Sequence, residues 1–261
     1  MTAASATELV VDKRSHFTYV LRIADASLIL GQRLGEVVGH APALEEDLGL
    51  ANIALDLLGQ ARLLLNHAGE IEGLDRTDDM LAFLREEGEF CNPTLVEQPN
   101  VDFAHILVRQ LLVDAWQFGL YEALAQSSDT RLAEIAAKSV KETRYHLGYS
   151  ADWIVRLGDG TSESHQRVQR AIDTLWPFTR ELFDPDEIDH EMTRAGVVPD
   201  LRSLHEAWDE RIGEVLTEAT LKRPVDRPYR WYGKRGAHGE HLGRLLAEMQ
   251  QLQRAYPGAS W

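Results

Sequence analysis

The chain has 261 residues, of which 44% are hydrophobic and 26% charged, an ordinary composition for a globular protein of one or two domains. Its net charge of −15 argues against nonspecific binding to nucleic acid or to an anionic membrane surface. The single cysteine excludes an intramolecular disulfide and a cysteine-based zinc site. Because we see no signal peptide and no uncharged apolar run of 18 residues, we expect a cytoplasmic protein.

The predicted elements are all helices, since no stretch shows the alternating β-branched pattern of a strand. Residues 1–17 are predicted to be a flexible tail and residues 18–261 a single domain. In chain order we expect helices at about 18–38, 44–67, 77–88, 102–125, 130–157, 163–183, 200–220 and 239–255, with a loop at 221–237. The fold class is therefore all-α.

The helix predicted at about 44–67 is the most apolar of the chain. Its leucines and alanines occupy nearly the whole circumference, which predicts a central helix that is covered on several sides. Asp56 lies within this helix. A buried carboxylate costs several kcal/mol unless it is paired, protonated or bound to a metal. The partner of Asp56 is therefore the first functional question.

Four acidic residues suggest the skeleton of a di-iron bundle. Asp25, Asp56, Asp114 and Glu142 lie on four of the long predicted helices, and a weak internal repeat aligns Asp56 with Glu142. Two helical hairpins with a carboxylate on each helix are typical of ferritin-like di-iron proteins. The similarity could also be a coincidence between two helices that are rich in alanine and leucine.

The histidines of such a site are missing. A di-iron bundle needs Glu-x-x-His on two of its helices, but Gly59 follows Asp56 and Tyr145 follows Glu142 at that spacing. His146 comes one residue late, about 100° around the helix. We therefore expect no metal in this chain and a structural site in which His146 bonds to a neighbouring carboxylate. Protonation or nearby cations must neutralise the rest, and the candidate cations are Arg62, Lys141 and Arg144.

The loop predicted at 221–237 reverses the charge of the chain, because it holds six basic residues and one acidic residue among aromatic side chains. One interpretation is a contact with an acidic partner or with phosphates. The alternative is a solvated loop whose arginines pair with the acidic body of the protein. The candidate contact residues are Arg227, Arg230, Lys234 and Arg235.

Long segments of the chain resemble a known family. They are LILGQRLGEVVGHAPALEEDLGLANIALDLLGQARLLL (28–65), NPTLVEQPN (92–100), KSVKETRYHLGYSADWIVRLGDGT (138–161), TLWPFTRELFDPDEID (174–189) and HGEHLGRLLAEMQQLQRAYPG (238–258). These segments strongly resemble the non-catalytic, ferritin-like subunit of the multicomponent phenylacetyl-CoA epoxidase of bacterial phenylacetate degradation. The resemblance covers nearly the whole chain from about residue 18.

This resemblance implies a ferritin-like bundle with additional C-terminal helices and a non-catalytic, structural role. In that family, the di-iron site and the CoA thioester lie in the catalytic subunit, with which the non-catalytic one pairs. A further small subunit, together with a reductase that uses FAD, a 2Fe-2S cluster and NADPH, completes the system. The resemblance therefore implies no cofactor in this chain, those three partners, and self-association when the partners are absent.

Two other functions stay open at this point. The first is a di-iron oxygenase or oxidase in its own right, with unusual ligands among Asp25, Asp56, Asp114, Glu142 and His146. The second is a binding module that uses the basic loop to hold the phosphates of CoA. We expect no partner that is a nucleic acid or a membrane.

Overall fold

The computed structural model describes residues 12–228 and 230–259, and its regular structure is helical apart from one antiparallel bridge between Tyr232 and Ala237. The all-α prediction is therefore confirmed. The helices of the described part are α1 (Lys13–Gly35), α2 (Leu44–Glu72), α3 (Asp78–Phe83), α4 (Phe103–Leu124), α5 (Thr130–Gly158), α6 (Ser162–Thr179), α7 (Glu187–Arg194), α8 (Leu201–Glu218), α9 (Glu240–Met249) and α10 (Gln251–Ala255). Single 3-10 turns lie at Glu87–Glu89, Arg180–Leu182 and Gly233–Arg235.

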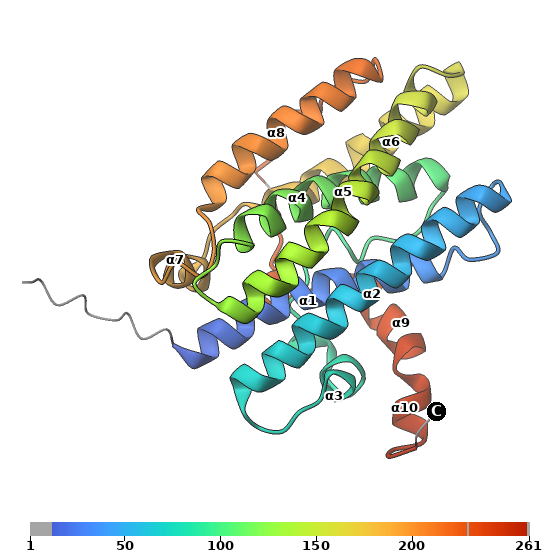
Figure 1. Ribbon diagram of the computed structural model, residues 1–261. Helices are drawn as coiled ribbons and strands as arrows, with labels where there is room; N and C mark the ends of the chain where they lie inside the picture. Colours follow the sequence, from blue (N-terminus) through green and yellow to red (C-terminus); the bar gives the residue numbers. More distant parts are fainter. Residues whose placement is uncertain (1–11, 229, 260–261) are drawn as a thin grey trace, which may run out of the picture.

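Two helical hairpins form the bundle. Helices α1 and α2 make the first and α4 and α5 the second, and the two lie against each other with further contact between α2 and α5 (Figure 1). Helices α6 and α8 pack on α4 and α5, while α7 and α9 contact α1. This is the predicted ferritin-like bundle with additional C-terminal helices, and its buried apolar residues form one continuous cluster.

Aspartates fix the starts of three of these long helices. Asp12, Asp102 and Asp129 are the N-caps of α1, α4 and α5, and each side chain accepts a hydrogen bond from a backbone N–H three residues further on. A cap of this kind contributes about 1 kcal/mol because it satisfies an N–H group that the helix leaves unpaired.

The central helix is α4 and not α2, so this prediction is wrong. In α4, 18 of 22 residues are buried, whereas in α2 only 11 of 29 are. The outer face of α2 leaves leucines in solvent, and Leu55 is 66% exposed. By length and hydropathy alone α2 could cross a membrane. Its inner face packs on α1, however, as in a core helix of a soluble protein, and one such helix is weak evidence for a membrane span.

Several element boundaries also differ from the prediction, and one helix was not predicted. Helix α1 begins at Lys13, so the tail was predicted too long, and its residues 1–11 lie outside the described part of the chain. Helix α7 was missed, because residues 187–194 carry four charged side chains within eight positions. The last predicted helix divides at Gln250, whose side-chain amide donates hydrogen bonds to two backbone carbonyls near the end of α3.

Candidate functional site at the centre of the bundle

A chain of hydrogen bonds crosses the centre of the four helices. Gln117 Nε2 on α4 donates to Ser27 Oγ on α1 at 3.0 Å, and Ser27 Oγ lies 3.3 Å from the hydroxyl of Tyr121 on α4. The Tyr121 hydroxyl donates to Gln60 Oε1 on α2 at 3.3 Å, and Gln60 Nε2 donates to Glu142 Oε2 on α5 at 2.9 Å. All four bundle helices are therefore joined through polar side chains.

The chain runs in one direction. If each group donates to the next, the order is Gln117, Ser27, Tyr121, Gln60 and finally Glu142, which as a carboxylate only accepts. The Tyr121 hydroxyl stays a donor because burial raises its pKa. At the open end, Glu142 is only partly buried and Lys138 Nζ lies 3.8 Å from it. The negative charge therefore sits near solvent while the interior carries neutral groups.

These residues do not fit a di-iron centre. Such a centre takes four carboxylates and two imidazoles from the four helices. The five residues that meet here supply one carboxylate, two amides and two hydroxyls. Neutral amides and hydroxyls do not offset the charge of two iron ions in a buried site. What the arrangement can do is hold the four helices in register through hydrogen bonds.

Asp25 and Asp114, two of the predicted carboxylates, are fully buried but have separate partners. The Arg85 guanidinium binds both oxygens of Asp25, and the Cys91 amide donates to Asp25 Oδ2 at 2.8 Å. Asp114 Oδ1 accepts from Gln110 at 2.6 Å. No cation pairs with Asp114 in the described structure, and burial raises its pKa to about 8. One carboxylate is thus neutralised by a cation and the other by a proton.

Asp56 and His146 form a pair at the seam between α2 and α5. His146 is fully buried, and its Nε2 lies 3.1 Å from Asp56 Oδ2, so the predicted bond to a neighbouring carboxylate is confirmed. Burial lowers the pKa of His146, and Asp56 opposes that shift. The side chain of Asp56 is 41% exposed, because it lies about 40° around the helix from Gln60, at the edge of the buried face.

The predicted convergence of the four carboxylates is therefore wrong, and so is the placement of Gly59 and Tyr145 at the bundle centre. Gly59 is partly exposed and Tyr145 is 57% exposed on the outer side of α5. The predicted cations also lie elsewhere: Arg62 pairs with Asp78, Arg144 pairs with Glu122, and Lys141 is exposed.

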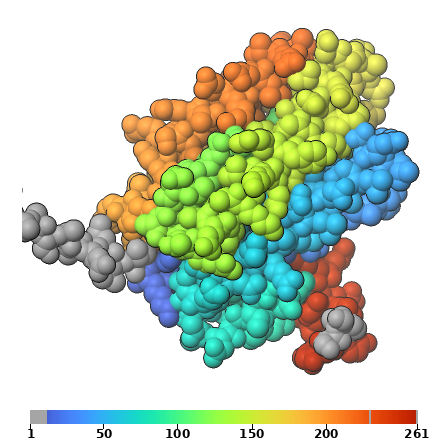
Figure 2. Space-filling model, in the orientation of Figure 1, coloured from blue at the N-terminus to red at the C-terminus, as the bar shows by residue number. Residues whose placement is uncertain are grey.

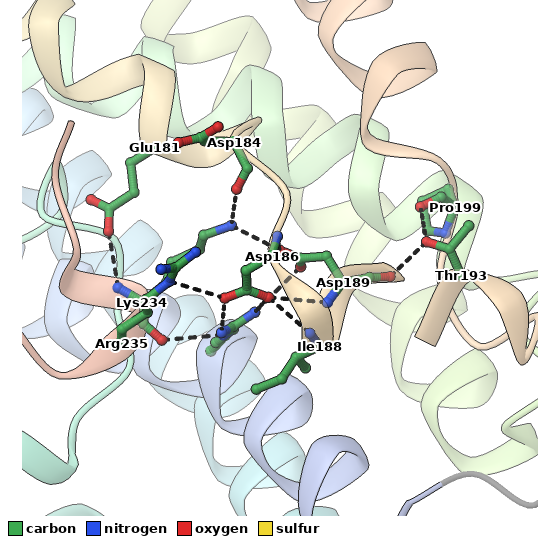
Figure 3. A network of polar contacts seen from close by, with 10 residues as sticks. Glu181, Asp184, Asp186, Ile188, Asp189, Thr193, Pro199, Lys234 and Arg235 are labelled. Atoms are coloured by element: carbon green, nitrogen blue, oxygen red, sulfur yellow. Dashed lines mark hydrogen bonds and ion pairs between the residues drawn. The ribbon is translucent and has the colours of Figure 1, made fainter. Parts of the chain in front are cut away.

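The basic loop is tied to the acidic body of the protein (Figure 3). Lys234 is buried, and its ammonium group binds Asp189 Oδ2 at 3.1 Å and the carbonyl of Asp184 at 3.0 Å. Arg235 lies 3.4 Å from Asp186, and Arg230 lies 3.7 Å from Asp184. A contact between Lys234 and a phosphate is not supported, since Lys234 is buried and its ammonium group already binds two acceptors within the chain.

The outer face of α2 exposes three leucines beside α5, whose own outer face is mostly charged but exposes Tyr145; we call this surface the α2–α5 face. Figure 2 shows the two helices next to each other on one side of the molecule. Leu44, Leu48 and Leu55 lie on one stripe of α2, and Tyr145 projects from α5. Large apolar side chains that stay exposed in this way are candidates for a protein–protein contact.

Sequence reasoning missed most of the central residues. Gln60 is a polar residue in an otherwise apolar helix, but Ser27, Gln117 and Tyr121 carry no motif. The usable signal was the set of uncharged polar side chains at otherwise apolar positions of α1, α2 and α4, which predicts a buried hydrogen-bond network.

Comparison with known proteins places this geometry in context. The family model described as phenylacetic acid catabolic protein matches residues 1–261. The chain is 52% identical over 243 residues to the C subunit of 1,2-phenylacetyl-CoA epoxidase of Escherichia coli strain K12. That alignment covers 93% of this chain and 98% of the relative.

Proposed function

Because this chain belongs to the phenylacetic acid catabolic protein family, we propose that it is the non-catalytic, structural subunit of the oxygenase that epoxidises the aromatic ring of phenylacetyl-CoA. The name of the E. coli relative supports the reaction and the assignment as one subunit of the epoxidase, since the two chains align over nearly their full lengths. The protein would act in the cytoplasm, in phenylacetate degradation.

One observation carries the non-catalytic role. The position where a ferritin-like bundle holds two iron ions contains the hydrogen-bond chain from Gln117 to Glu142. Its five groups cross-link α1, α2, α4 and α5, and a metal centre would also hold these four helices together in a bundle. The chemistry would then belong to a partner subunit with a di-iron site, and FAD, 2Fe-2S and NADPH would belong to a reductase.

The α2–α5 face is the candidate contact with that catalytic partner. A bundle descended from a paired architecture keeps the apolar surface of the pair, and Leu55 and Tyr145 are exposed there. Aromatic and aliphatic side chains that become fully buried in a contact supply most of its binding energy. Without the partner the same surface would drive self-association of this chain. The reductase and the small subunit would bind elsewhere on the assembled complex.

The two other functions have less support. An independent di-iron enzyme would need ligands that converge, but Asp25, Asp114 and Asp56 have different partners in separate places. A site for CoA phosphates would need free cations, and Lys234, Arg230 and Arg235 already pair with acidic groups. Arg227, which lines a cavity of about 290 Å³, is the predicted contact residue with no ion pair among the described side chains.

The test is assembly with the catalytic partner. Co-expression of the two chains should yield a stable complex that oxidises phenylacetyl-CoA when the reductase and NADPH are added, whereas this chain alone should be inactive. The variant Leu55→Arg should weaken assembly at least tenfold, because it buries a charge in the contact. The control is Leu74→Arg, since Leu74 is 70% exposed outside the α2–α5 face.

Two results would overturn the proposal. Oxygenase activity of the chain without its partner would assign the catalysis to this bundle. Equal assembly by the Leu55 and Leu74 variants would remove the α2–α5 face from the contact, and failure of the wild-type chain to bind the catalytic partner at micromolar concentration would remove the structural role itself.

A further inference from the structure

Two histidines and an aspartate from three helices meet away from the bundle centre. His16 lies near the start of α1, His67 lies in the C-terminal part of α2, and Asp129 is the N-cap of α5. One ligand atom from each residue lies within 4.8 Å of the other two. We propose that these three side chains bind one divalent transition-metal ion, with Zn²⁺ as the favoured ion, and so clamp the three helices together.

The donor atoms are arranged for a shared ion. His16 Nε2 lies 2.8 Å and His67 Nε2 lies 2.6 Å from the same oxygen, Asp129 Oδ2. The other oxygen, Oδ1, accepts the capping hydrogen bond from the Leu132 amide, which fixes the carboxylate in place. The two imidazole rings are nearly perpendicular, with centroids 6.0 Å apart. Two Nε2 atoms and one carboxylate oxygen therefore converge from three directions.

The distances require only a small adjustment. Zinc binds histidine nitrogen and carboxylate oxygen at about 2.0–2.2 Å, so the ligand atoms of a tetrahedral ion lie roughly 3.3 Å apart. The two nitrogen–oxygen separations would have to widen by about 0.6 Å. Rotation of the His16 and His67 side chains supplies this without moving a helix. Three protein ligands leave a fourth position for water, as in other zinc sites with three side chains.

The second nitrogen of His67 also suits a bound ion. His67 is 93% buried, and its Nδ1 has no hydrogen-bond partner in the described structure, although Glu70 Oε2 lies 3.6 Å away. In a neutral ring that donates from Nε2 to Asp129, the lone pair of Nδ1 would face the Glu70 carboxylate. When Nε2 binds a metal, Nδ1 carries the hydrogen and can donate it to Glu70.

That second arrangement is the usual one around a metal. A metal-bound histidine commonly donates its other N–H to a carboxylate, which fixes the ring and strengthens the ligand. Glu70 stands three residues after His67 on the same face of α2, and its side chain is largely exposed, so it can close the remaining gap. The choice of metal follows from the donors, because two imidazoles and one carboxylate suit Zn²⁺ and exclude a preference for Mg²⁺ or Ca²⁺.

The site is separate from the bundle centre. None of its three residues takes part in the chain from Gln117 to Glu142, and none was singled out by a sequence motif. Its effect would be structural: the ion would connect the first turns of α1 to α2 and to the start of α5. Sequence separation explains why it escaped notice, since His16 and His67 are 51 residues apart and Asp129 follows 62 residues later.

The test uses the full chain without a polyhistidine tag, stripped with a chelator and titrated with Zn²⁺ against a colorimetric zinc indicator. We expect one tightly bound Zn²⁺ per chain. In His16→Gln and His67→Gln the affinity should fall at least tenfold, while the glutamine amide keeps a donor for Asp129. His40→Gln is the control, because His40 is exposed beyond the other end of α1.

Thermal unfolding supplies the second measurement. At a free Zn²⁺ concentration one hundred times the dissociation constant, the melting temperature of the wild-type chain should rise by roughly 5–10 °C. The His16 and His67 variants should show no such rise, and the His40 variant should match the wild type. Equal affinity in wild type and both ligand variants, or saturation with Zn²⁺ that leaves the melting temperature unchanged, would show a hydrogen-bonded cluster only and overturn the proposal.

Discussion

Replacement of Asp114 by asparagine should make the free energy of unfolding less sensitive to pH. Burial raises the pKa of Asp114 from 3.8 to about 8. Between these values the folded state holds a proton that the unfolded state has released, so the contribution of Asp114 to stability falls as the pH rises. The loss is about 1.4 kcal/mol per pH unit, or roughly 3 kcal/mol between about pH 5 and pH 7.

The contacts of Asp114 support a neutral side chain. Ser150 Oγ lies 2.8 Å from Asp114 Oδ2 and 3.3 Å from the carbonyl of Leu147. The serine hydroxyl has one hydrogen, so both contacts are satisfied when Asp114 donates its own proton to Ser150 and Ser150 donates to Leu147. An asparagine amide can make the same donation and still accept from Gln110. Asp114→Asn should therefore keep the local structure.

Asp25→Asn is the matched comparison, because Asp25 is equally buried but faces the Arg85 guanidinium. Removal of its charge leaves a buried cation unpaired and should cost about 3–5 kcal/mol at every pH in this range. Urea unfolding followed by circular dichroism at fixed protein concentration measures both variants. Parallel pH profiles for the wild type and Asp114→Asn, or equal costs for the two variants at pH 5, would refute the reasoning.

Three further predictions concern single side chains. Tyr121→Phe should lower the free energy of unfolding by about 1–3 kcal/mol in urea titrations, since it interrupts the central chain and leaves Gln60 Oε1 without its donor; an unchanged midpoint would contradict this. The Cys91 thiol, whose pKa burial raises to about 12, should alkylate slowly, and its rate should still rise above pH 9, where that of an ordinary thiol levels off; a plateau near pH 9 would contradict it. Burial disfavours the charged form of His238, but hydrogen bonds to Glu97 and the Phe90 carbonyl outweigh burial and raise the pKa of His238. The contribution of His238 to the stability of the fold is therefore complete below pH 6.5 and is lost as the pH rises through the pKa of the folded state. The cost of His238→Gln should accordingly shrink from pH 6 to pH 9, and a constant cost would count against the pair.

Helix positions were largely predictable because their signals are local. Aspartate caps and glycine-rich or proline-rich breaks bound the long helices, and α8 lies within one or two residues of its predicted ends. The first turn of α1 and the whole of α7 were not predicted, because charged side chains mask a short amphipathic pattern there. The contact of α1 with α2 is close at Gly31, where an added Cβ would lie 3.2 Å from the Leu58 side chain.

The central helix was predicted wrongly for a physical reason. An apolar pattern shows that one face of a helix avoids water. It does not show whether the surface that covers this face belongs to the same chain or to another one. The exposed leucines of α2 therefore made it look more buried within this chain than α4. The carboxylates were misjudged similarly, because Asp25 pairs with Arg85, which lies 60 residues away on the connection after α3. No local pattern reports a partner at that separation.

The most direct test of the central claim is the iron content of the bundle. We predict that the chain, produced alone in iron-supplemented medium, carries no di-iron absorption and that its complex with the catalytic partner carries two iron atoms per pair of chains. The same measurement on the His67→Gln variant excludes iron bound by His16, His67 and Asp129. Two iron atoms per isolated chain, retained in His67→Gln and lost in Glu142→Ala, would contradict the account and assign a metal centre to this bundle.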